Sequence, residues 1–275
     1  MKRAQLLKEL ELTLPPTEAR ALLAFALGES TPELFAKLDE PLSKSELARV
    51  EELFKRRRRG EPLGLILGEV EFLGLRLKVR PGVFLPRPET EGLVELALKS
   101  LEEKTAPRVL DVGTGSGAIA LAIKSARKDA EVYASDINER ALALARENAR
   151  ALGLEVTFLK APLTAGVDDL DLIVANPPYL PESYRKSAPP ELAYEPEEAL
   201  FAGEDGLAVA RPLLHEAKSA LRPGGSLLLE LDPTNAALLA REAIGLGFSS
   251  VHVLPDLAKR PRYLLARAPA AEAAG

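Results

Sequence analysis

Residues 109–120, with the sequence VLDVGTGSGAIA, decide how this chain folds. The first four are mainly apolar and predict a buried strand, and the glycines at 113, 115 and 117 predict a sharp turn after it. The apolar residues that follow predict a helix, whose partly positive amino-terminal end points at a ligand near the glycines. In open parallel sheets, ligands bind at this place, beyond the carboxyl ends of the strands.

The glycine turn fits two kinds of ligand. The pattern G-x-G-x-x-A from Gly113 matches a dinucleotide fingerprint, whereas G-x-G-x-G with an acid two residues earlier matches a loop that binds S-adenosylmethionine (AdoMet). Asp111 would attract the ammonium group of AdoMet and would repel a pyrophosphate. Asp136 stands at the end of the next expected strand, where an acid holds ribose hydroxyls. The two carboxylates favour AdoMet, and a dinucleotide remains the alternative.

Composition limits the class of protein. The 275 residues allow one large or two modest domains, and a hydrophobic fraction of 47% is enough for a sizeable core. A net charge of −5 argues against a protein that coats nucleic acid, and the lack of cysteine excludes disulfides and a thiol nucleophile. The charged start, MKRAQLLKELELTL, has no long apolar core, and no transmembrane run follows it. We therefore expect a soluble cytoplasmic protein that does not bind membranes.

The pattern of the chain predicts a helical domain over 1–60, a linking β-hairpin within 61–88 and an α/β domain over 89–275. In the first part, Ser43-x-x-Glu46 matches a capping box, and Thr31 and Pro32 are expected to be the N-cap and the first residue of another helix. From residue 108, strands and helices alternate regularly, which predicts one doubly wound sheet. Strands are expected over 108–112, 131–135, 155–160, 171–175, 226–231, 249–254 and 262–267, and a turn over 222–225.

A second motif, Asn176-Pro177-Pro178-Tyr179, follows the strand expected over 171–175. The side-chain carbonyl of Asn176 and an adjacent backbone carbonyl can each accept one N–H from a substrate NH2 group, and the prolines stiffen this frame. Tyr179 offers an aromatic face for a planar group. The motif therefore suits a primary amide or an aromatic amine, whose nitrogen lone pair is delocalised.

Other polar residues have plainer explanations. His215 and His252 are the only histidines and fall away from both motifs, so we expect no histidine base, and no metal-ligand cluster is visible. The basic run Lys55–Arg59 suits the carboxyl-terminal end of a helix, where cations are favourable, although a patch for RNA stays open.

Taken together, several stretches resemble the N5-glutamine methyltransferases that modify peptide chain release factors, the PrmC/HemK family. They are 60–63 (GEPL), 84–91 (FLPRPETE), 111–117, Asp136, 176–179, 195–196 and 203–207. The resemblance implies a Rossmann-like class I AdoMet-dependent methyltransferase with a mostly parallel seven-stranded sheet, and S-adenosylhomocysteine as the product. It implies as substrate the glutamine of the Gly-Gly-Gln motif in class I release factors, which the helical domain would grip. We expect a monomer that forms no stable complex with nucleic acid.

The resemblance also implies the site residues. Those expected to bind the cofactor are Asp111, Gly113, Thr114, Gly115, Ser116, Gly117, Asp136, Ile137, Leu163 and Asn176. The residues expected in catalysis are Asn176, Pro177 and Tyr179, and those expected to bind substrate are Asn176, Pro177, Pro178, Tyr179, Arg87 and Glu89. Pro162 and Leu163 depart from the Asp and the aromatic residue that the family commonly carries there, and Leu65 also replaces an aromatic residue.

Three other functions stay open at this point. N6-adenine methyltransferases of DNA or RNA share the second motif, although a base-flipping enzyme needs a cationic groove. A non-catalytic module could bind RNA through Arg56–Arg59, and an NAD-linked oxidoreductase would leave 176–179 unexplained.

Overall fold

The computed structural model describes residues 1–271, which divide into two compact units. The first unit contains Met1–Glu69 together with Pro190–Tyr194, and the second contains the rest of the described chain. The sequence order does not indicate that residues 190–194 belong with the amino-terminal unit.

The first unit is helical, with α1 (Arg3–Glu11), α2 (Pro16–Leu27), α3 (Thr31–Ala36), α4 (Lys44–Arg58) and α5 (Leu63–Leu67). Leu22, Leu23 and Leu34 are fully buried in its core. The predicted capping box of α4 is confirmed, since the Ser43 hydroxyl accepts the Glu46 N–H at 3.2 Å and the Glu46 carboxylate accepts the Ser43 N–H at 2.7 Å.

The predicted cap of α3 is wrong by one residue. Ser30, rather than Thr31, is the N-cap, because Ser30 and Glu33 form a second capping box that places Thr31 inside the first turn.

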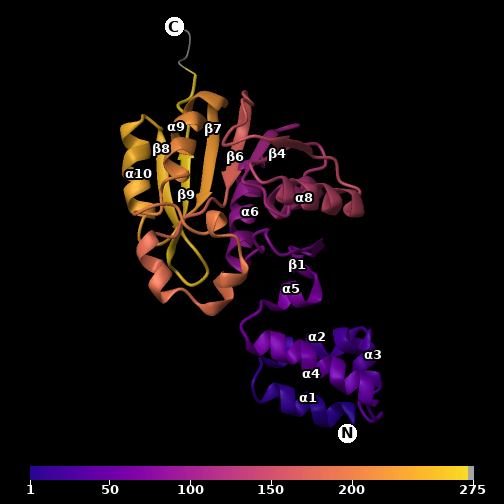
Figure 1. Ribbon diagram of the computed structural model, residues 1–275. Coiled ribbons are helices and arrows are strands. Elements are labelled where there is room, and N and C mark those ends of the chain that lie inside the picture. Colours follow the sequence, from indigo (N-terminus) through magenta and orange to yellow (C-terminus); the bar gives the residue numbers. More distant parts are fainter. Residues whose placement is uncertain (272–275) are drawn as a thin grey trace. The chain divides into compact units, whose positions relative to one another are not determined.

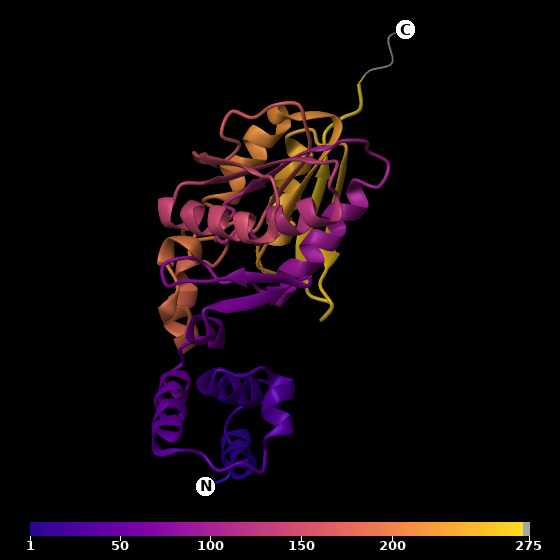
Figure 2. The ribbon, with the colours of Figure 1, turned by 90° about the vertical axis from the view of Figure 1, so that its right-hand side faces the viewer.

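The predicted hairpin consists of β1 (Glu69–Phe72) and β2 (Leu75–Lys78), and in the second unit it lies along α8 (Glu139–Leu152), as Figure 2 shows. Asn148 of α8 holds it there: its side chain accepts the Lys78 N–H at 2.8 Å and donates to the Lys78 carbonyl at 3.1 Å. The same amide group donates to the Ser116 carbonyl at 2.9 Å, which connects the hairpin to the glycine turn.

The second unit contains a seven-stranded sheet in the order β5-β4-β3-β6-β7-β9-β8. The strands are β3 (Arg108–Val112), β4 (Glu131–Asp136), β5 (Thr157–Lys160), β6 (Leu170–Ala175), β7 (Leu221–Glu230), β8 (Ser250–Pro255) and β9 (Pro261–Arg267). Among these strands, β9 is antiparallel to both of its neighbours, β7 and β8, and the other neighbouring pairs are parallel. The predicted, mostly parallel sheet is therefore confirmed. The turn predicted over 222–225 is instead part of β7, where the pairing with β6 shifts register.

Helices cover both faces of this sheet (Figure 1). On one face, α9 (Ala210–Ala220) and α10 (Ala236–Gly245) pack on residues such as Leu110 and Val112. On the other, α6 (Pro88–Ser100) and α7 (Ala118–Ala126) pack on Val109. Three short 3-10 helices, 182–187, 190–194 and 197–199, follow the second motif and were not predicted. Among the described residues, no helix has both the length and the apolar character needed to cross a membrane.

The chain order reverses beside β3. From β3 the chain adds β4 and β5 on one side, and then β6 and β7 on the other. At such a reversal, the connections leave the carboxyl ends of neighbouring strands in opposite directions and open a crevice between them. Both motifs follow strands that end at this crevice, β3 and β6.

Candidate active site

A cavity of about 360 Å³ lies at the carboxyl ends of β3, β4 and β6, within the second unit. Pockets that hold small molecules have volumes of roughly 300–1,000 Å³ and mostly apolar walls. The residues that line this cavity are Val83, Phe84, Pro86, Thr90, Val112, Gly113, Thr114, Gly115, Ser116, Ala118, Ile119, Asp136, Ile137, Asn138, Ala141, Ala161, Pro162, Leu163, Asn176, Pro178, Pro196, Glu198, Ala199, Ala208, Val209 and Pro212.

The glycine turn presents bare backbone to this cavity. Gly113 and Gly115 have φ angles of +69° and +57°, which favour glycine. A Cβ on Gly113 would meet no atom within 4 Å, and one on Gly115 would come no nearer than 4.0 Å to the Phe84 carbonyl. The open space beside both residues lets a ligand approach the main chain closely. Gly117, also predicted to bind the cofactor, lies outside the lining.

Asp111 lies behind the turn. Its Oδ2 accepts the Thr114 hydroxyl at 2.6 Å and the Ala120 N–H at 3.1 Å, and thus ties the turn to the first turn of α7. Its Oδ1 is buried and accepts no hydrogen bond from the described residues. Burial raises the pKa of Asp111 to about 7. The side chain points to the same face of the sheet as Val109, toward α7. We expected Asp111 to bind the cofactor, but it does not line the cavity.

Asp136 does line the cavity, at the end of β4. Its two carboxylate oxygens accept main-chain N–H groups, from Gly115 at 2.9 Å and from Asn138 at 2.8 Å. Ile137 and Leu163, which were also predicted, lie in the same wall. The Leu163 carbonyl accepts the Ser135 hydroxyl at 2.8 Å, which joins the loop after β5 to β4.

The charges of the cavity discriminate between the two ligands that the sequence left open. Among the described residues that line it, the charged ones are Asp136 and Glu198, with no lysine or arginine. AdoMet carries a sulfonium and an ammonium group, which these carboxylates would stabilise, whereas a pyrophosphate would be repelled. The bare glycines, the apolar walls and the two carboxylates therefore fit AdoMet.

Only part of the second motif, residues 176–179, lines the cavity. Asn176 and Pro178 line the cavity, whereas Pro177 and Tyr179 do not. The Tyr179 hydroxyl donates to the Glu230 carboxylate at 3.3 Å, and burial raises the pKa of Tyr179. The aromatic face expected for the substrate is thus not part of the wall, because the hydroxyl holds the ring toward a partner inside the protein.

Two residues near Asn176, Thr90 and Glu230, were not predicted from the sequence as part of the site. The Asn176 Nδ2 donates to the Thr90 hydroxyl at 3.1 Å, and that hydroxyl donates to Glu230 Oε2 at 2.9 Å. Glu230 is fully buried, and burial raises its pKa to about 7. A signal for Glu230 was present in the sequence, since it is an acid near the end of the apolar strand predicted over 226–231.

Arg87 and Glu89, predicted to bind substrate, lie outside the lining and are engaged elsewhere. The Arg87 guanidinium pairs with the buried Glu195 and lies 5.2 Å from the centre of the Phe84 ring. Glu89 pairs with Arg260 at 3.5 Å. In this structure Arg87 fixes the loop before α6, and Glu89, in the first turn of α6, pairs with the segment between β8 and β9.

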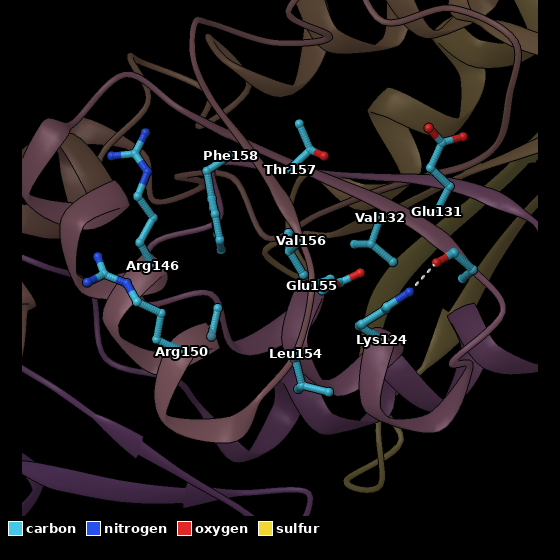
Figure 3. A pocket seen from close by; sticks show the side chains of 12 residues that line it. Lys124, Glu131, Val132, Arg146, Arg150, Leu154, Glu155, Val156, Thr157 and Phe158 are labelled. Carbon is cyan, nitrogen blue, oxygen red and sulfur yellow. Dashed lines mark hydrogen bonds between the residues drawn. The ribbon is translucent and has the colours of Figure 1, made fainter.

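A second hollow, of about 550 Å³, lies among α7, α8 and the starts of β4 and β5 (Figure 3). Arg146 and Phe158 are on its wall, and Lys124 donates to the Ala130 carbonyl at 2.7 Å. It lies away from the carboxyl ends of the strands and touches neither motif. In the described part of the chain, no three His, Cys, Asp or Glu side chains gather as metal ligands would.

Two cations of the basic run Lys55–Arg59 form ion pairs inside the first unit. Arg56 pairs with Glu61 at 2.6 Å, and Arg57 pairs with Glu18 and Glu191 at 2.8 and 2.9 Å. These pairs weaken the case for a patch that binds RNA.

Two family models match parts of the chain. The family described as "PrmC N-terminal domain" matches residues 2–68, and "Methyltransferase small domain" matches residues 74–195. Among solved structures, a 16S rRNA methyltransferase of T. thermophilus, solved with AdoMet and guanosine, has a TM-score of 0.54 and 24% identity, over 73% of this chain and 49% of that one. A methyltransferase of Pyrococcus furiosus has a TM-score of 0.53 and 21% identity, over 70% of this chain and 88% of that one. These likenesses show the fold of an AdoMet-dependent methyltransferase.

Curated relatives match nearly the whole chain. The release factor glutamine methyltransferase of Deinococcus radiodurans is 48% identical over 254 residues, which are 92% of this chain and 91% of the relative. That of Moorella thermoacetica is 42% identical over 258 residues, again 92% and 91%. By its glycine turn, its Asn-Pro-Pro-Tyr motif and this identity over its length, the chain belongs to the release factor glutamine methyltransferases.

Proposed function

We infer that this chain transfers a methyl group from AdoMet to the side-chain nitrogen, N5, of the glutamine in the Gly-Gly-Gln motif of peptide chain release factors. The observation that carries this function is the orientation of Asn176: its Nδ2 is held by Thr90, so its carbonyl oxygen is left for a substrate N–H. The relatives described above, which are named for the same reaction, support it.

The residues of the first motif would hold AdoMet. Gly113 and Gly115 leave room for it against the main chain, and Asp136, on the cavity wall, would accept the ribose hydroxyls. When bound, AdoMet supplies a methyl group on a positively charged sulfur, which makes the methyl carbon electrophilic. The apolar lining would limit the access of water to the reacting groups once AdoMet fills the cavity.

The residues of the second motif would hold the glutamine. A carboxamide nitrogen is a poor nucleophile because its lone pair is delocalised into the carbonyl group. The Asn176 Oδ1, on the cavity wall, would accept one N–H of this nitrogen. The adjacent Pro177 carbonyl, although Pro177 is not part of the lining, would accept the other, since neither oxygen accepts a hydrogen bond from the described residues. Two acceptors favour its tetrahedral form, in which the lone pair is available. Orientation of this kind contributes roughly 7–11 kcal/mol to well-aligned reactions.

The same two oxygens would reject glutamate. A substrate carboxylate has no N–H to donate and would bring a negative charge against two acceptors. A site built to bind an N–H group discriminates strongly against analogues that lack it.

The remaining expectations follow from this substrate. We propose that the chain acts as a monomer in the cytoplasm, where release factors work, and that the helical unit contributes to gripping the release factor. The net charge of −5 and the paired Arg56 and Arg57 support the absence of a stable nucleic-acid complex.

The test is a side-by-side incubation with labelled AdoMet. We expect label in a release factor, none in its Gln→Ala variant and none in adenine-containing DNA. Label in the DNA alone would overturn the proposal in favour of an N6-adenine methyltransferase.

A further inference from the structure

We propose that Thr90 and Glu230 are positioning residues that determine which end of the Asn176 amide faces the substrate. The inference rests on the proposed function, because it assigns a purpose to the direction of that amide. Neither residue reacts: each acts through Asn176.

The orientation of the Asn176 side-chain amide follows from a series of hydrogen-bond donors and acceptors. An ionised carboxylate only accepts hydrogen bonds, so the single proton of the Thr90 hydroxyl is donated to Glu230 Oε2, at 2.9 Å. The hydroxyl oxygen can then only accept, and the group that it meets at 3.1 Å must be the Asn176 Nδ2. The Asn176 carbonyl is thereby left for the cavity. A reversed amide would place two acceptors against each other and would present NH2 to the NH2 of the substrate.

The burial of Glu230 argues for this use. In the described part of the chain, its carboxylate makes no ion pair, and its side-chain hydrogen bonds come from Thr90 and Tyr179. The nearby Arg262 is engaged with Asp256 at 3.5 Å and with the Leu231 carbonyl at 3.2 Å. A buried carboxylate without an ion pair costs free energy that an apolar residue would not. A residue that forces the orientation of Asn176 explains why this cost is tolerated.

The proposal predicts a dependence on pH. The charged and titratable groups around Glu230 are Glu89 on α6, Tyr179 after β6, and Arg262 and Tyr263 on β9. Burial is the largest effect, so the Glu230 carboxyl keeps its proton up to about pH 7. Once protonated, it can donate to Thr90, which frees the hydroxyl proton and allows the Asn176 amide to reverse. Turnover should therefore rise as Glu230 ionises.

The first experiment compares Thr90→Val with Thr90→Ser in the full chain. Valine keeps the shape and removes the hydroxyl, whereas serine keeps the hydroxyl. With a release factor as substrate, we expect kcat to fall at least about tenfold in Thr90→Val, which corresponds to about 1.4 kcal/mol, and Thr90→Ser to stay near the wild type. Titration calorimetry should show similar AdoMet affinity in both variants, which separates positioning from loss of the cofactor site. Equal kcat in the two variants would overturn the proposal.

The second experiment replaces the ionisable carboxyl group of Glu230. In Glu230→Gln, the pH profile of kcat should lose the step near neutral pH that we expect in the wild type, and calorimetric unfolding reports whether the variant is folded. An unchanged step in this variant would also overturn the proposal. A wild-type protein that methylates no release factor would instead refute the proposed function itself.

Discussion

Asp111 offers a quantitative test of how this site is built, because its buried carboxylate should make stability depend on pH. The pKa of Asp111 is raised by burial from an ordinary 3.8 to about 7. A folded-state pKa above the unfolded one means that the stabilisation is complete below pH 3.8, is lost as the pH rises toward 7 and is absent above it. The whole difference, about three pKa units, corresponds to about 4 kcal/mol.

The measurement compares Asp111→Asn with the wild type by calorimetric unfolding at pH 5 and pH 8. Over this interval the wild type should lose about 3 kcal/mol through Asp111, or roughly 6–12 °C in the unfolding temperature of a unit of this size. The asparagine can still accept from Thr114 and Ala120 and cannot ionise, so this part of the loss should vanish. Contributions from Glu230, present in both proteins, cancel in the comparison.

A matched control is Asp168→Asn, which removes an exposed carboxylate from the same unit. It should lose stability between pH 5 and pH 8 as the wild type does. If Asp111→Asn also behaved like the wild type, the carboxylate would not be paying a burial cost, and the reasoning would be refuted.

Three further substitutions test the site. Asn176→Ala should reduce turnover at least about 100-fold, since it removes an acceptor for the substrate amide, while calorimetric titration still detects most of the AdoMet affinity; equal loss of both would make Asn176 chiefly a cofactor ligand. Asp136→Ala should weaken AdoMet binding about tenfold or more, and an unchanged titration would contradict the ribose assignment. Gly117→Ala should lower stability by about 1–3 kcal/mol in thermal unfolding, because φ is +87° and the new Cβ would lie 3.1 Å from Ala145 Cβ and Leu121 Cδ1; a melting temperature equal to that of the wild type would show that the helices adjust.

Local signals predicted most of the framework. The apolar run 109–112, the capping box at Ser43 and the alternation of the hairpin each depend on residues a few positions apart, and each formed as predicted. Errors arose where two local explanations competed, as at Ser30 and Thr31. Another arose where β7 begins before an expected turn and continues past it, although residues 222–225 have no partner on β6. The short 3-10 helices after the second motif have no periodic pattern to announce them.

By itself, the sequence determined the elements, their alternation and the two motifs at strand ends, because strand and helix periodicity, turn chemistry and capping are local properties of the chain. Tertiary structure alone decided which side chains meet. It brought Thr90 from α6, Asn176 after β6 and Glu230 from β7 into one hydrogen-bonded chain, and it turned Asp111 and Tyr179 away from the cavity. These outcomes depend on sheet order and on which face of a strand each residue occupies. Thr90 and Glu230, which are joined directly by a hydrogen bond, are 140 positions apart in the sequence.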